Sequence, residues 1–426
     1  MVTNPRSTLN CLASFGIGGL VSTGYPFGIA AAIFMPAFSM RQASRFGAYQ
    51  AAFCYYAGAS WPVIPAARNF FGSSASTTEG ITAWLAAAVL LATPWALLWT
   101  PRQGQLIWRV LLGLTASVIP PLGIIGWASP LTSAGLLFPG AAWLGLAAVA
   151  LLCATLCMKS LWPPTVIAVA VLAVASYAEK GADPQPPPGW ETFNTNFGAI
   201  AHGPANVVRQ FQTAQWIQNR TRCSNARVLI FPEMVVPRWT AAMELFWQQT
   251  LANLTASGKT LLIGAGIPIS SGARAGEITR YDFASAVAVL RAEQTTSLRR
   301  PGIPDETETA SYRNALLMRG AHRGVYSQHV PVPLGMWHPF GEAGVPLNLF
   351  GPGVIRIDRQ RAAVLICYEQ LLTWPILLAA FQHPTVLIGM ANDYWVEGTP
   401  IPRHEGTAIR AWARLFGIPL LAARNR

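Results

Sequence analysis

The chain has 426 residues, of which 52% are hydrophobic and only 11% are charged, against about 25% charged residues in ordinary soluble domains. With 30 Lys and Arg against 18 Asp and Glu, the formal net charge is +12. These values exclude a disordered protein, a disulfide scaffold and an ordinary cytosolic enzyme, and the length predicts two or three domains.

The first 178 residues carry very little charge. They contain one acidic residue, Glu79, and seven basic residues, while the other 248 residues hold 17 acids and 23 bases. Sparse charge between apolar runs is typical of membrane spans. No run of Lys or Arg would follow a nucleic-acid backbone, so we expect no nucleic-acid partner, and contact with anionic lipid headgroups is the simpler interpretation of the basic excess.

Long apolar runs predict a membrane domain over residues 1–180. A helix needs about 20 apolar residues to cross a bilayer, and five runs have this character: 46–65, 80–100, 107–127, 132–157 and 161–178. Residues 8–39 are also apolar but are interrupted at 24–26, which predicts two short, re-entrant or tilted segments. The total is about seven spans, and their continuation over about 140 residues disfavours a cleaved signal peptide.

The basic residues of the connecting loops predict the orientation of these spans. Alternate loops, starting from the N-terminus, hold Arg6, Arg41, Arg45, Arg102, Arg109 and Lys159, whereas the opposite loops hold Arg68 and Lys180. Because basic loops stay in the cytoplasm, we expect the N-terminus there. Seven spans then place the rest of the chain in the periplasm, outside a bacterial inner membrane, and one span fewer would invert this conclusion.

The cysteines predict neither a disulfide framework nor a metal site. Cys11, Cys54, Cys153 and Cys157 lie in apolar runs, as small buried hydrophobes do. Cys223 and Cys367 remain, and a single thiol at the end of a strand is a candidate nucleophile.

A proline-rich linker over 181–190 is expected to be extended, and an α/β domain is predicted over 191–426. Short apolar runs without alternation are typical of strands buried on both faces. The expected strands are 227–231, 260–264, 362–367, 385–390 and 418–423, and the expected helices are 204–219, 238–256, 370–381 and 404–416. Two nucleotide-like segments, at 257–260 and 264–266, lack the glycines that phosphate-binding loops require, so they predict no such site.

Two of the expected strands end in reactive side chains. Glu233 follows the first strand and Cys367 ends the third, and ligands of α/β sheets bind at the carboxyl ends of strands. A carboxylate near a thiol can act as a general base and generate the thiolate nucleophile. Taken singly, Glu233 is also explained as a solvated loop acid or a helix cap, and Cys367 as an inert buried thiol.

Taken together, these segments resemble the carbon–nitrogen hydrolase (nitrilase) superfamily. The resemblance is carried by FPE at 231–233, LICYE at 365–369 and NDYW at 392–395, and Arg410 and the closing LLAARN run also fit. Because predicted membrane spans precede these segments, the resemblance is more specific to the apolipoprotein N-acyltransferase branch of the superfamily. Within that branch, PVPLGMW at 331–337 is most similar to plasmid conjugal-transfer proteins of the TraB type. The resemblance implies an αββα sandwich that follows the multi-span membrane domain.

The family also implies roles for individual residues. Glu233 takes the place of the base, Cys367 that of the nucleophile, and Glu369 that of a second carboxylate that orients the site. No cofactor and no metal ion are implied. The residues expected to bind substrate are Tyr368, His329, Glu342, Asn392, Asp393 and Trp395.

The lysine of the family's Glu–Lys–Cys triad has no counterpart. The three lysines of the chain, Lys159, Lys180 and Lys259, all lie outside 324–342, where the family places its own. The local match YSQHVP at 326–331 puts Gln328 in the lysine's place, beside His329, and Arg323 is a further candidate. The family's lysine stabilises the oxyanion, and loss of one such donor costs roughly 3–4 kcal/mol. Relatives also continue beyond Arg426 with further strands and a final span.

Three functions are weighed on this basis. The first is a membrane acyltransferase that passes a phospholipid acyl chain through a thioester to a protein amine, which in the resembling branch belongs to a lipoprotein. The second is a catalytically impaired structural component of the conjugation apparatus, favoured by the missing lysine. The third, a small-molecule amidase or nitrilase, ranks last because a soluble substrate gives no purpose to seven spans.

Overall fold

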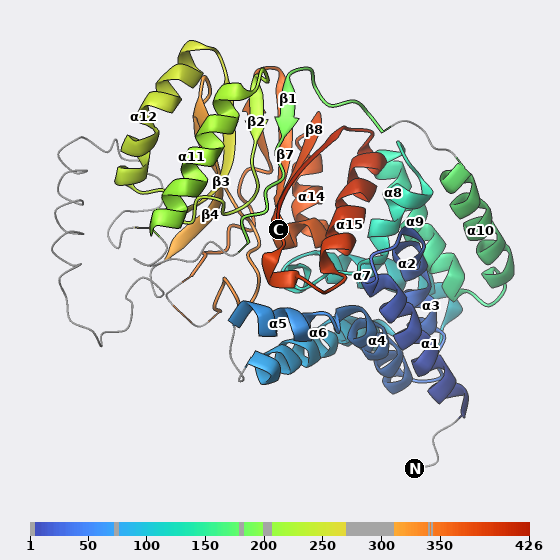
Figure 1. The fold of residues 1–426 in the computed structure, drawn as a ribbon. Coiled ribbons are helices and arrows are strands. Elements are labelled where there is room, and N and C mark those ends of the chain that lie inside the picture. Colours follow the sequence, from blue (N-terminus) through green and yellow to red (C-terminus); the bar gives the residue numbers. More distant parts are fainter. Residues whose placement is uncertain are drawn as a thin grey trace. The chain divides into compact units, whose positions relative to one another are not determined.

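The computed structural model describes residues 5–71, 76–178, 183–198, 207–269, 311–339, 341 and 344–426 (Figure 1). By internal contacts the chain divides into two compact units. Unit 1 comprises Met1–Pro187, Pro352–Gly389 and Trp395–Leu421, and unit 2 comprises Pro188–Gly351, Met390–Tyr394 and Ala422–Arg426. The division follows contacts and not chain order, so the domain boundaries 1–180, 181–190 and 191–426 stay a prediction.

The first segment of unit 1 is helical. Its longest helix, α6, carries a proline, Pro94, in its interior. The helices are α1 (Pro5–Ser22), α2 (Pro26–Ala31), α3 (Met35–Met40), α4 (Arg45–Ser60), α5 (Val63–Phe71), α6 (Ser76–Leu98), α7 (Leu106–Val118), α8 (Ala134–Leu137), α9 (Ala142–Cys157) and α10 (Trp162–Ala178).

Prolines divide several of the apolar runs into shorter helices than expected. Pro lacks the N–H that a helix interior needs, and it disfavours helical backbone in the preceding residue. Accordingly α4 ends before Pro62, and α7 ends at Val118, two residues before Pro120. The expected span 132–157 is broken between α8 and α9, where Gly140 follows Pro139 with a φ of +75°.

Within the described residues, one helix has both the length and the apolar composition needed to cross a membrane, and it is Thr77–Leu98 of α6. The shorter apolar helices cover Thr8–Ser22, Pro26–Met40, Ala142–Cys157 and Trp162–Leu172. Helix length therefore does not confirm the expectation of about seven spans.

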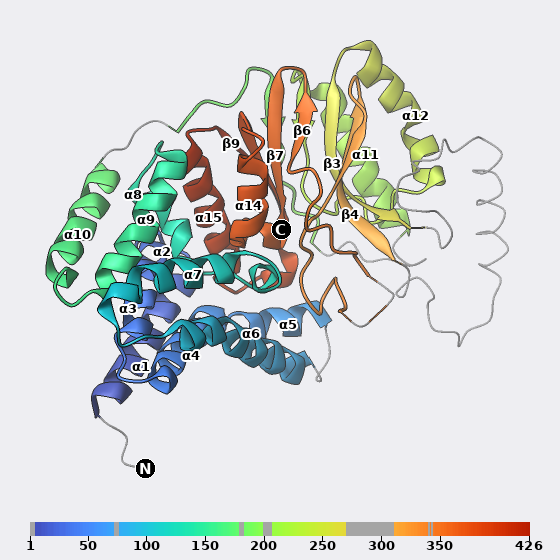
Figure 2. The same cartoon turned by 180° about the vertical axis from the view of Figure 1, so that it is seen from behind.

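The later segments of unit 1 supply most of a four-stranded sheet in the order β6-β7-β8-β9. Its strands are β6 (Val354–Ile357), β7 (Gln360–Ile366), β8 (Val386–Asn392) and β9 (Leu420–Asn425), and the last residues of β8 and β9 belong to unit 2. Figure 2 shows α14 (Thr373–Ala380) and α15 (Ile401–Phe416) beside this sheet. β6 and β7 form an antiparallel hairpin with a two-residue loop, in which Asp358 has a φ of +52°.

One apolar core joins these later segments to the N-terminal helices. Buried residues of β7, α14 and α15 belong to the same cluster as buried residues of α4, α6, α7 and α9. α8 and α15 approach each other closely, because a Cβ on Gly135 would lie 1.7 Å from the carbonyl oxygen of Ala411. A polar contact also joins α15 to the N-terminal segment, since the Thr407 hydroxyl of α15 donates to the Gly24 carbonyl at 2.7 Å.

Unit 2 is built on a five-stranded sheet in the order β1-β2-β3-β4-β5. β1 (Trp190–Thr192), β2 (Val228–Ile230) and β3 (Thr260–Pro268) run parallel, whereas β4 (Tyr312–Gly320) and β5 (Gly324–Ser327) continue the sheet antiparallel. α11 (Val207–Cys223) and α12 (Ala241–Ala256) pack on it through a second apolar cluster. The Thr240 hydroxyl begins α12 by accepting the N–H of Met243 at 3.3 Å.

The five expected strands and four expected helices of residues 191–426 are therefore confirmed, each within a few residues, as β2, β3, β7, β8 and β9 and as α11, α12, α14 and α15. The alternation of strands and helices confirms an α/β fold. Strands β1, β4, β5 and β6 were not expected from the sequence.

Candidate active site

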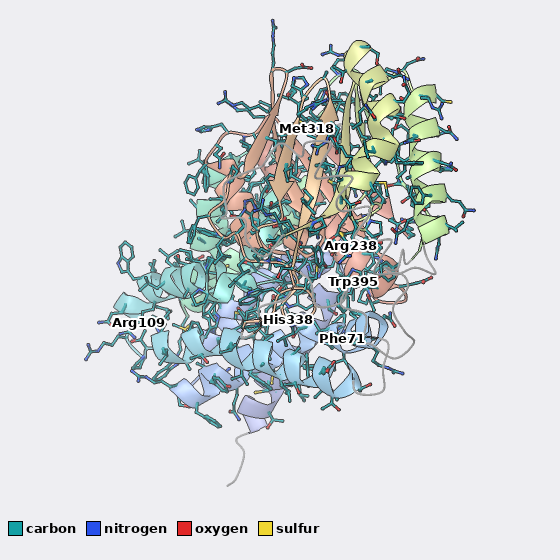
Figure 3. All side chains as sticks on the ribbon, turned by 90° about the vertical axis from the view of Figure 1, so that its left-hand side faces the viewer. Phe71, Arg109, Arg238, Met318, His338 and Trp395 are labelled. Carbon is teal, nitrogen blue, oxygen red and sulfur yellow. The ribbon has the colours of Figure 1, made fainter. Side chains whose placement is uncertain are left out.

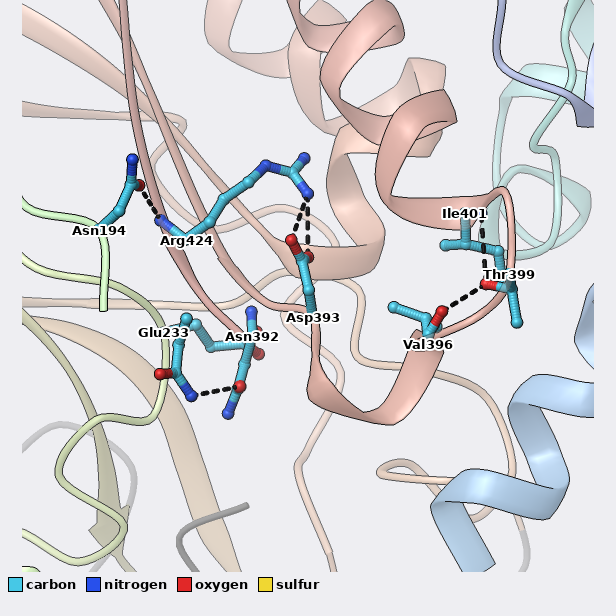
Figure 4. A network of polar contacts seen from close by, with 9 residues as sticks. Asn194, Glu233, Asn392, Asp393, Val396, Thr399, Ile401 and Arg424 are labelled. Carbon is cyan, nitrogen blue, oxygen red and sulfur yellow. Dashed lines mark hydrogen bonds and ion pairs between the residues drawn. The ribbon is translucent and has the colours of Figure 1, made fainter. Parts of the chain in front are cut away.

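Glu233 lies just beyond β2 and is almost fully buried, with 3% of its surface exposed. Both of its carboxylate oxygens accept hydrogen bonds. Asn314 Nδ2 donates to Oε1 at 2.6 Å. The backbone N–H of Asn392 donates to Oε2 at 2.9 Å, and Glu233 and Asn392 are both labelled in Figure 4. Hydrogen bonds to the charged form of a carboxyl group favour that form. The contacts therefore offset part of the cost of burying a carboxylate here.

The glycines of β3 allow the chain around Glu233 to approach the sheet closely. A Cβ on Gly264 would lie 2.4 Å from the Cα of Glu233, and a Cβ on Gly266 would lie 2.2 Å from the Pro237 carbonyl oxygen. Only glycine fits such an approach of two backbones. The Gly-Ala-Gly segment, which predicts no nucleotide site, thus has a structural role beside Glu233.

Gln328 is joined to Glu233 through one intervening side chain. Asn314, in β4, uses the same Nδ2 that bonds Glu233 to donate to Gln328 Oε1 at 2.9 Å. Asn314 and Gln328 are each 1% exposed. The structure thus brings Gln328, the residue in the lysine's place, into one hydrogen-bond network with Glu233. Sequence reasoning missed Asn314, which stands directly before the apolar run ALLM at 315–318.

Tyr312 is the first residue of β4, and His329 lies two residues after the end of β5. The ring of His329 is buried, and its Nδ1 lies 2.9 Å from the Tyr326 hydroxyl. Burial, and to a lesser extent the negative charges of Glu233 and Tyr394, raise the pKa of Tyr312 to about 12. Tyr312 is therefore a neutral hydroxyl near Glu233 at neutral pH.

Asn392 is the last residue of β8 and Asp393 follows it, and both side chains bind residues of β9 (Figure 4). Asn425 Nδ2 donates to Asn392 Oδ1 at 2.8 Å, and Arg424 Nη1 pairs with Asp393 Oδ2 at 2.8 Å. Asn392 thus reaches Glu233 through its backbone, while its side chain is engaged by Asn425. Asp393 serves as the partner of Arg424.

Cys367 directly follows β7 and has an unusual backbone conformation. Its φ is +52°, a region that residues other than glycine rarely adopt, and the residue is 2% exposed. A short 3₁₀ turn, Cys367–Leu371, begins here. The buried Glu369 supports the turn, because its Oε2 accepts the N–H of Ile366 at 2.8 Å.

Two further expected residues lie in unit 1 with Cys367. The Tyr368 hydroxyl donates to the Ile124 carbonyl at 2.9 Å, and burial raises the pKa of Tyr368 well above its ordinary value. Trp395, labelled in Figure 3, packs edge-on against Phe70, with ring centroids 5.8 Å apart. Both side chains therefore have structural partners from the N-terminal helices.

The expected site residues fall into two groups. Glu233, Gln328, His329, Asn392 and Asp393 belong to unit 2, whereas Cys367, Tyr368, Glu369 and Trp395 belong to unit 1. Glu342 lies outside the described residues. That the two groups form one catalytic site stays a prediction. Across the described ranges, no three or more His, Cys, Asp or Glu side chains are grouped so that they could hold a metal ion.

Known proteins similar to this chain were found by sequence and by structure, although no family model matches it. A probable conjugal transfer protein TraB of Sinorhizobium fredii is 27% identical over 421 residues, which cover 97% of each chain. A conjugal transfer protein TraB of Agrobacterium fabrum is 26% identical, over 99% of this chain and 93% of the relative. Among solved structures, a mutant amidase of the nitrilase superfamily from Nesterenkonia is 14% identical, over 57% of this chain and 79% of the amidase, with a TM-score of 0.32.

Proposed function

The chain is a homologue, over nearly its whole length, of proteins named conjugal transfer protein TraB, and from this premise we propose that it is a membrane component of plasmid conjugal transfer. We further propose that its α/β part is a cysteine-dependent acyltransferase of the nitrilase type, with the two sheets forming an αββα sandwich. The donor is a phospholipid and the acceptor is a protein amine.

The observation that carries the enzymatic proposal is the conformation of Cys367. A left-handed backbone at a residue other than glycine costs roughly 1–3 kcal/mol, and such residues cluster at active sites. Here the strained residue is the cysteine that directly follows β7, and the carboxylate of Glu369 supports the turn that this cysteine begins. A thiol that served only to fill the core would need no such backbone.

The proposed reaction has two steps. Glu233 takes the proton of the Cys367 thiol, and Sγ attacks the ester carbonyl of the phospholipid. The tetrahedral intermediate breaks the ester C–O bond, the proton passes from Glu233 to the leaving alkoxide, and a lysophospholipid departs from a thioester. An amine then attacks the thioester, an amide forms, and the thiolate regains a proton.

Gln328 is proposed to donate a neutral hydrogen bond to the oxyanion in both steps, in place of the family's lysine. His329, Tyr368, Glu342, Asn392, Asp393 and Trp395 keep the proposed role of shaping the substrate site. A neutral donor stabilises an oxyanion less than an ammonium group does. We therefore expect the reaction to be slower than in members of the family that have the lysine.

Exposed apolar side chains support the membrane location of the N-terminal helices. Large apolar patches on a surface indicate contact with membrane or protein, and α1, α6, α7, α9 and α10 each expose such residues: Leu9, Leu12, Leu90, Leu97, Trp108, Leu112, Leu144, Leu151, Ile167 and Val171 are 49–79% exposed. Arg109 of α7, which is labelled in Figure 3, donates to the carbonyls of Leu98 and Trp99 at the end of α6. A cation at this position satisfies the last carbonyls of a helix.

We propose about seven spans in the inner membrane, including short ones, with the N-terminus in the cytoplasm and the α/β part in the periplasm. Alkaline phosphatase fused after residue 190 tests the orientation, because this enzyme is active only outside the cytoplasm. The proposed topology also predicts an active fusion after residue 72. Inactive fusions at both positions would invert the proposed orientation, and an inactive fusion after residue 190 alone would place the α/β part in the cytoplasm.

The acyltransferase is tested by the intact mass of the purified full-length protein after incubation with phospholipid vesicles. We expect an adduct of one acyl chain that hydroxylamine removes, because a thioester is sensitive to this reagent. Cys367→Ala should lack the adduct, whereas Cys223→Ala, which removes an exposed cysteine, should keep it. An unmodified wild-type protein would contradict the acyltransferase.

The second candidate is a structural component of the conjugation apparatus without catalysis, and the glutamine in the lysine's place favours it. It predicts that Cys367→Ala and Glu233→Gln leave the frequency of plasmid transfer unchanged. A defect in both variants, with normal protein levels in the membrane, would exclude it.

A further inference from the structure

We propose that Asn314 is a positioning residue that fixes both the carboxylate of Glu233 and the amide of Gln328. The inference rests on the proposed function, since it concerns the base and the oxyanion donor of that reaction. It adds a residue that neither the sequence motifs nor the comparisons indicate.

The carboxylate of Glu233 determines which atom donates in the two hydrogen bonds that Asn314 makes to Glu233 and Gln328. A carboxylate only accepts hydrogen bonds, so the Asn314 atom that lies 2.6 Å from Glu233 Oε1 must be the NH₂ nitrogen. The second hydrogen of the same nitrogen then points to the amide of Gln328, 2.9 Å away, and the atom that faces it must be the oxygen Oε1. The NH₂ group of Gln328 is therefore turned away from Asn314, as an oxyanion donor requires.

The amide of Asn314 is poorly explained by stability alone. Its carbonyl oxygen Oδ1 is buried and has no hydrogen-bond partner among the described residues. An unpaired buried acceptor costs folding free energy, and each such group in a native protein calls for an explanation. Here the two bonds made by the NH₂ group, one to each of two proposed site residues, provide that explanation.

Asn314 and Asn392 hold the two oxygens of Glu233 separately. The bond from Asn392 comes from its backbone N–H, so changes of the Asn392 side chain leave that donor in place. The bond from Asn314 comes from a side chain and can be removed alone. Other titratable groups of this part of unit 2 are Tyr312 on β4, Tyr394 and Asp393 after β8, His329 after β5 and Arg424 on β9.

Removal of the Asn314 donor should raise the pKa of Glu233, because a hydrogen bond to its charged form is lost. A base with a raised pKa is protonated, and so inactive, up to a higher pH. In a plot of rate against pH, the rise in rate at low pH, here called the acid limb, therefore moves to higher pH. A purely structural role of Asn314 would lower the rate at every pH and leave the limb in place.

The test measures the rate at which iodoacetamide alkylates Cys367 in the full-length protein, from about pH 4 to pH 9, with the modified peptide quantified by mass. Asn314→Leu removes the amide, and Asn314→Asp keeps its shape while it replaces the donor by a second carboxylate. The matched control is Asn253→Leu, because Asn253 is exposed on α12 and its side chain bonds Gln249 at 3.1 Å. Glu233→Gln shows which limb belongs to Glu233.

We expect the acid limb to disappear in Glu233→Gln. It should move up by about one pH unit in Asn314→Leu and further in Asn314→Asp. It should stay in place in Asn253→Leu. A limb that is unchanged in both Asn314 variants, or that persists in Glu233→Gln, would overturn the inference. Because alkylation needs no phospholipid, a shifted limb without any acyl adduct would refute the acyltransferase and leave the role of Asn314 intact.

Discussion

Gln328 shows how a single residue can set the rate of the proposed reaction. It is buried within the hydrogen-bond network of Glu233, where a lysine ammonium would have a carboxylate nearby and would stay charged. We expect Gln328→Lys to form the acyl adduct of Cys367 about 10²-fold faster, since a charged donor replaces a neutral one at the oxyanion. Intact mass spectrometry at successive times measures the rate at which the acyl adduct forms in each variant.

The control for that substitution is Gln328→Leu, which removes the donor altogether. Its adduct should form about 10²-fold more slowly than that of the wild type. Equal rates in the lysine and leucine variants would show that residue 328 does not face the reacting carbonyl.

His404 gives a pH dependence to the stability of unit 1. It is buried, stacks on Trp127 at 6.0 Å between ring centroids, and burial lowers its pKa from 6.5 to about 4. The unfolded chain therefore binds a proton between these two pH values that the folded chain does not. Stability is fully present above pH 6.5 and falls as the pH drops toward 4, by about 3 kcal/mol in total.

We expect His404→Phe to abolish most of this loss of stability between pH 6.5 and pH 4. The thermal unfolding midpoint of the full-length protein, measured at several pH values in one detergent, checks it. His338→Asn is the control, because His338 is exposed, and it should keep the wild-type slope. A wild-type slope in His404→Phe would refute the assignment.

At the scale of residues, the sequence predicted those site residues that follow strands, and it missed those inside them. Glu233 and Cys367 stand where apolar runs end, so their positions were visible in the pattern. Asn314 lies within β4, which the sequence did not reveal as a strand, and its partners are 81 and 14 residues away. The left-handed backbone of Cys367 depends on how the following turn is held, and no local pattern indicates it.

The contact between α8 and α15 connects the N-terminal helices to the α/β part of unit 1. Gly135→Ala would place a methyl group against the Ala411 carbonyl, and because both partners are backbone, one helix must move. We expect a loss of about 2 kcal/mol of stability, in the range of overpacked cores, measured as a lower thermal midpoint. Gly19→Ala, in α1 with nothing within 4 Å of the new methyl, should be neutral or stabilising, and equal effects would contradict the contact.

At the scale of elements, the strands with continuous apolar character were predicted and the others were not. β7 and β8 are buried along most of their length, whereas β5 and β6 are short and partly exposed. The apolar runs of the N-terminal half predicted helices correctly, but not where they end. Prolines such as Pro62 and Pro139 lie just beyond the ends of α4 and α8, where apolar composition alone would continue the helix.

At the scale of the whole molecule, unit 1 needs chain segments from both ends of the sequence. Buried side chains of α15, such as Ile409 and Trp412, share one core with the N-terminal helices. We expect residues 188–426 alone to aggregate, because each large apolar side chain left exposed forfeits roughly 1.5–3 kcal/mol. Co-expression with residues 1–187 should recover a soluble complex in detergent.

Size-exclusion chromatography and a thermal melt of the two fragments, made separately and together, measure this outcome. The full-length protein in the same detergent is the reference. A monomeric fragment 188–426 that melts cooperatively by itself would contradict the shared core, and it would support an independent domain at 191–426.

The interleaving of unit 1 also has a consequence for synthesis in the cell. Residues 188–351 separate the N-terminal helices from the segments that complete their core, and translation at about 5–20 residues per second takes roughly 10–30 s to pass them. During this interval the face of α8 that receives α15 has no partner from its own chain. The nascent protein therefore needs a chaperone or the lipid itself to cover that face until the last α-helix leaves the ribosome.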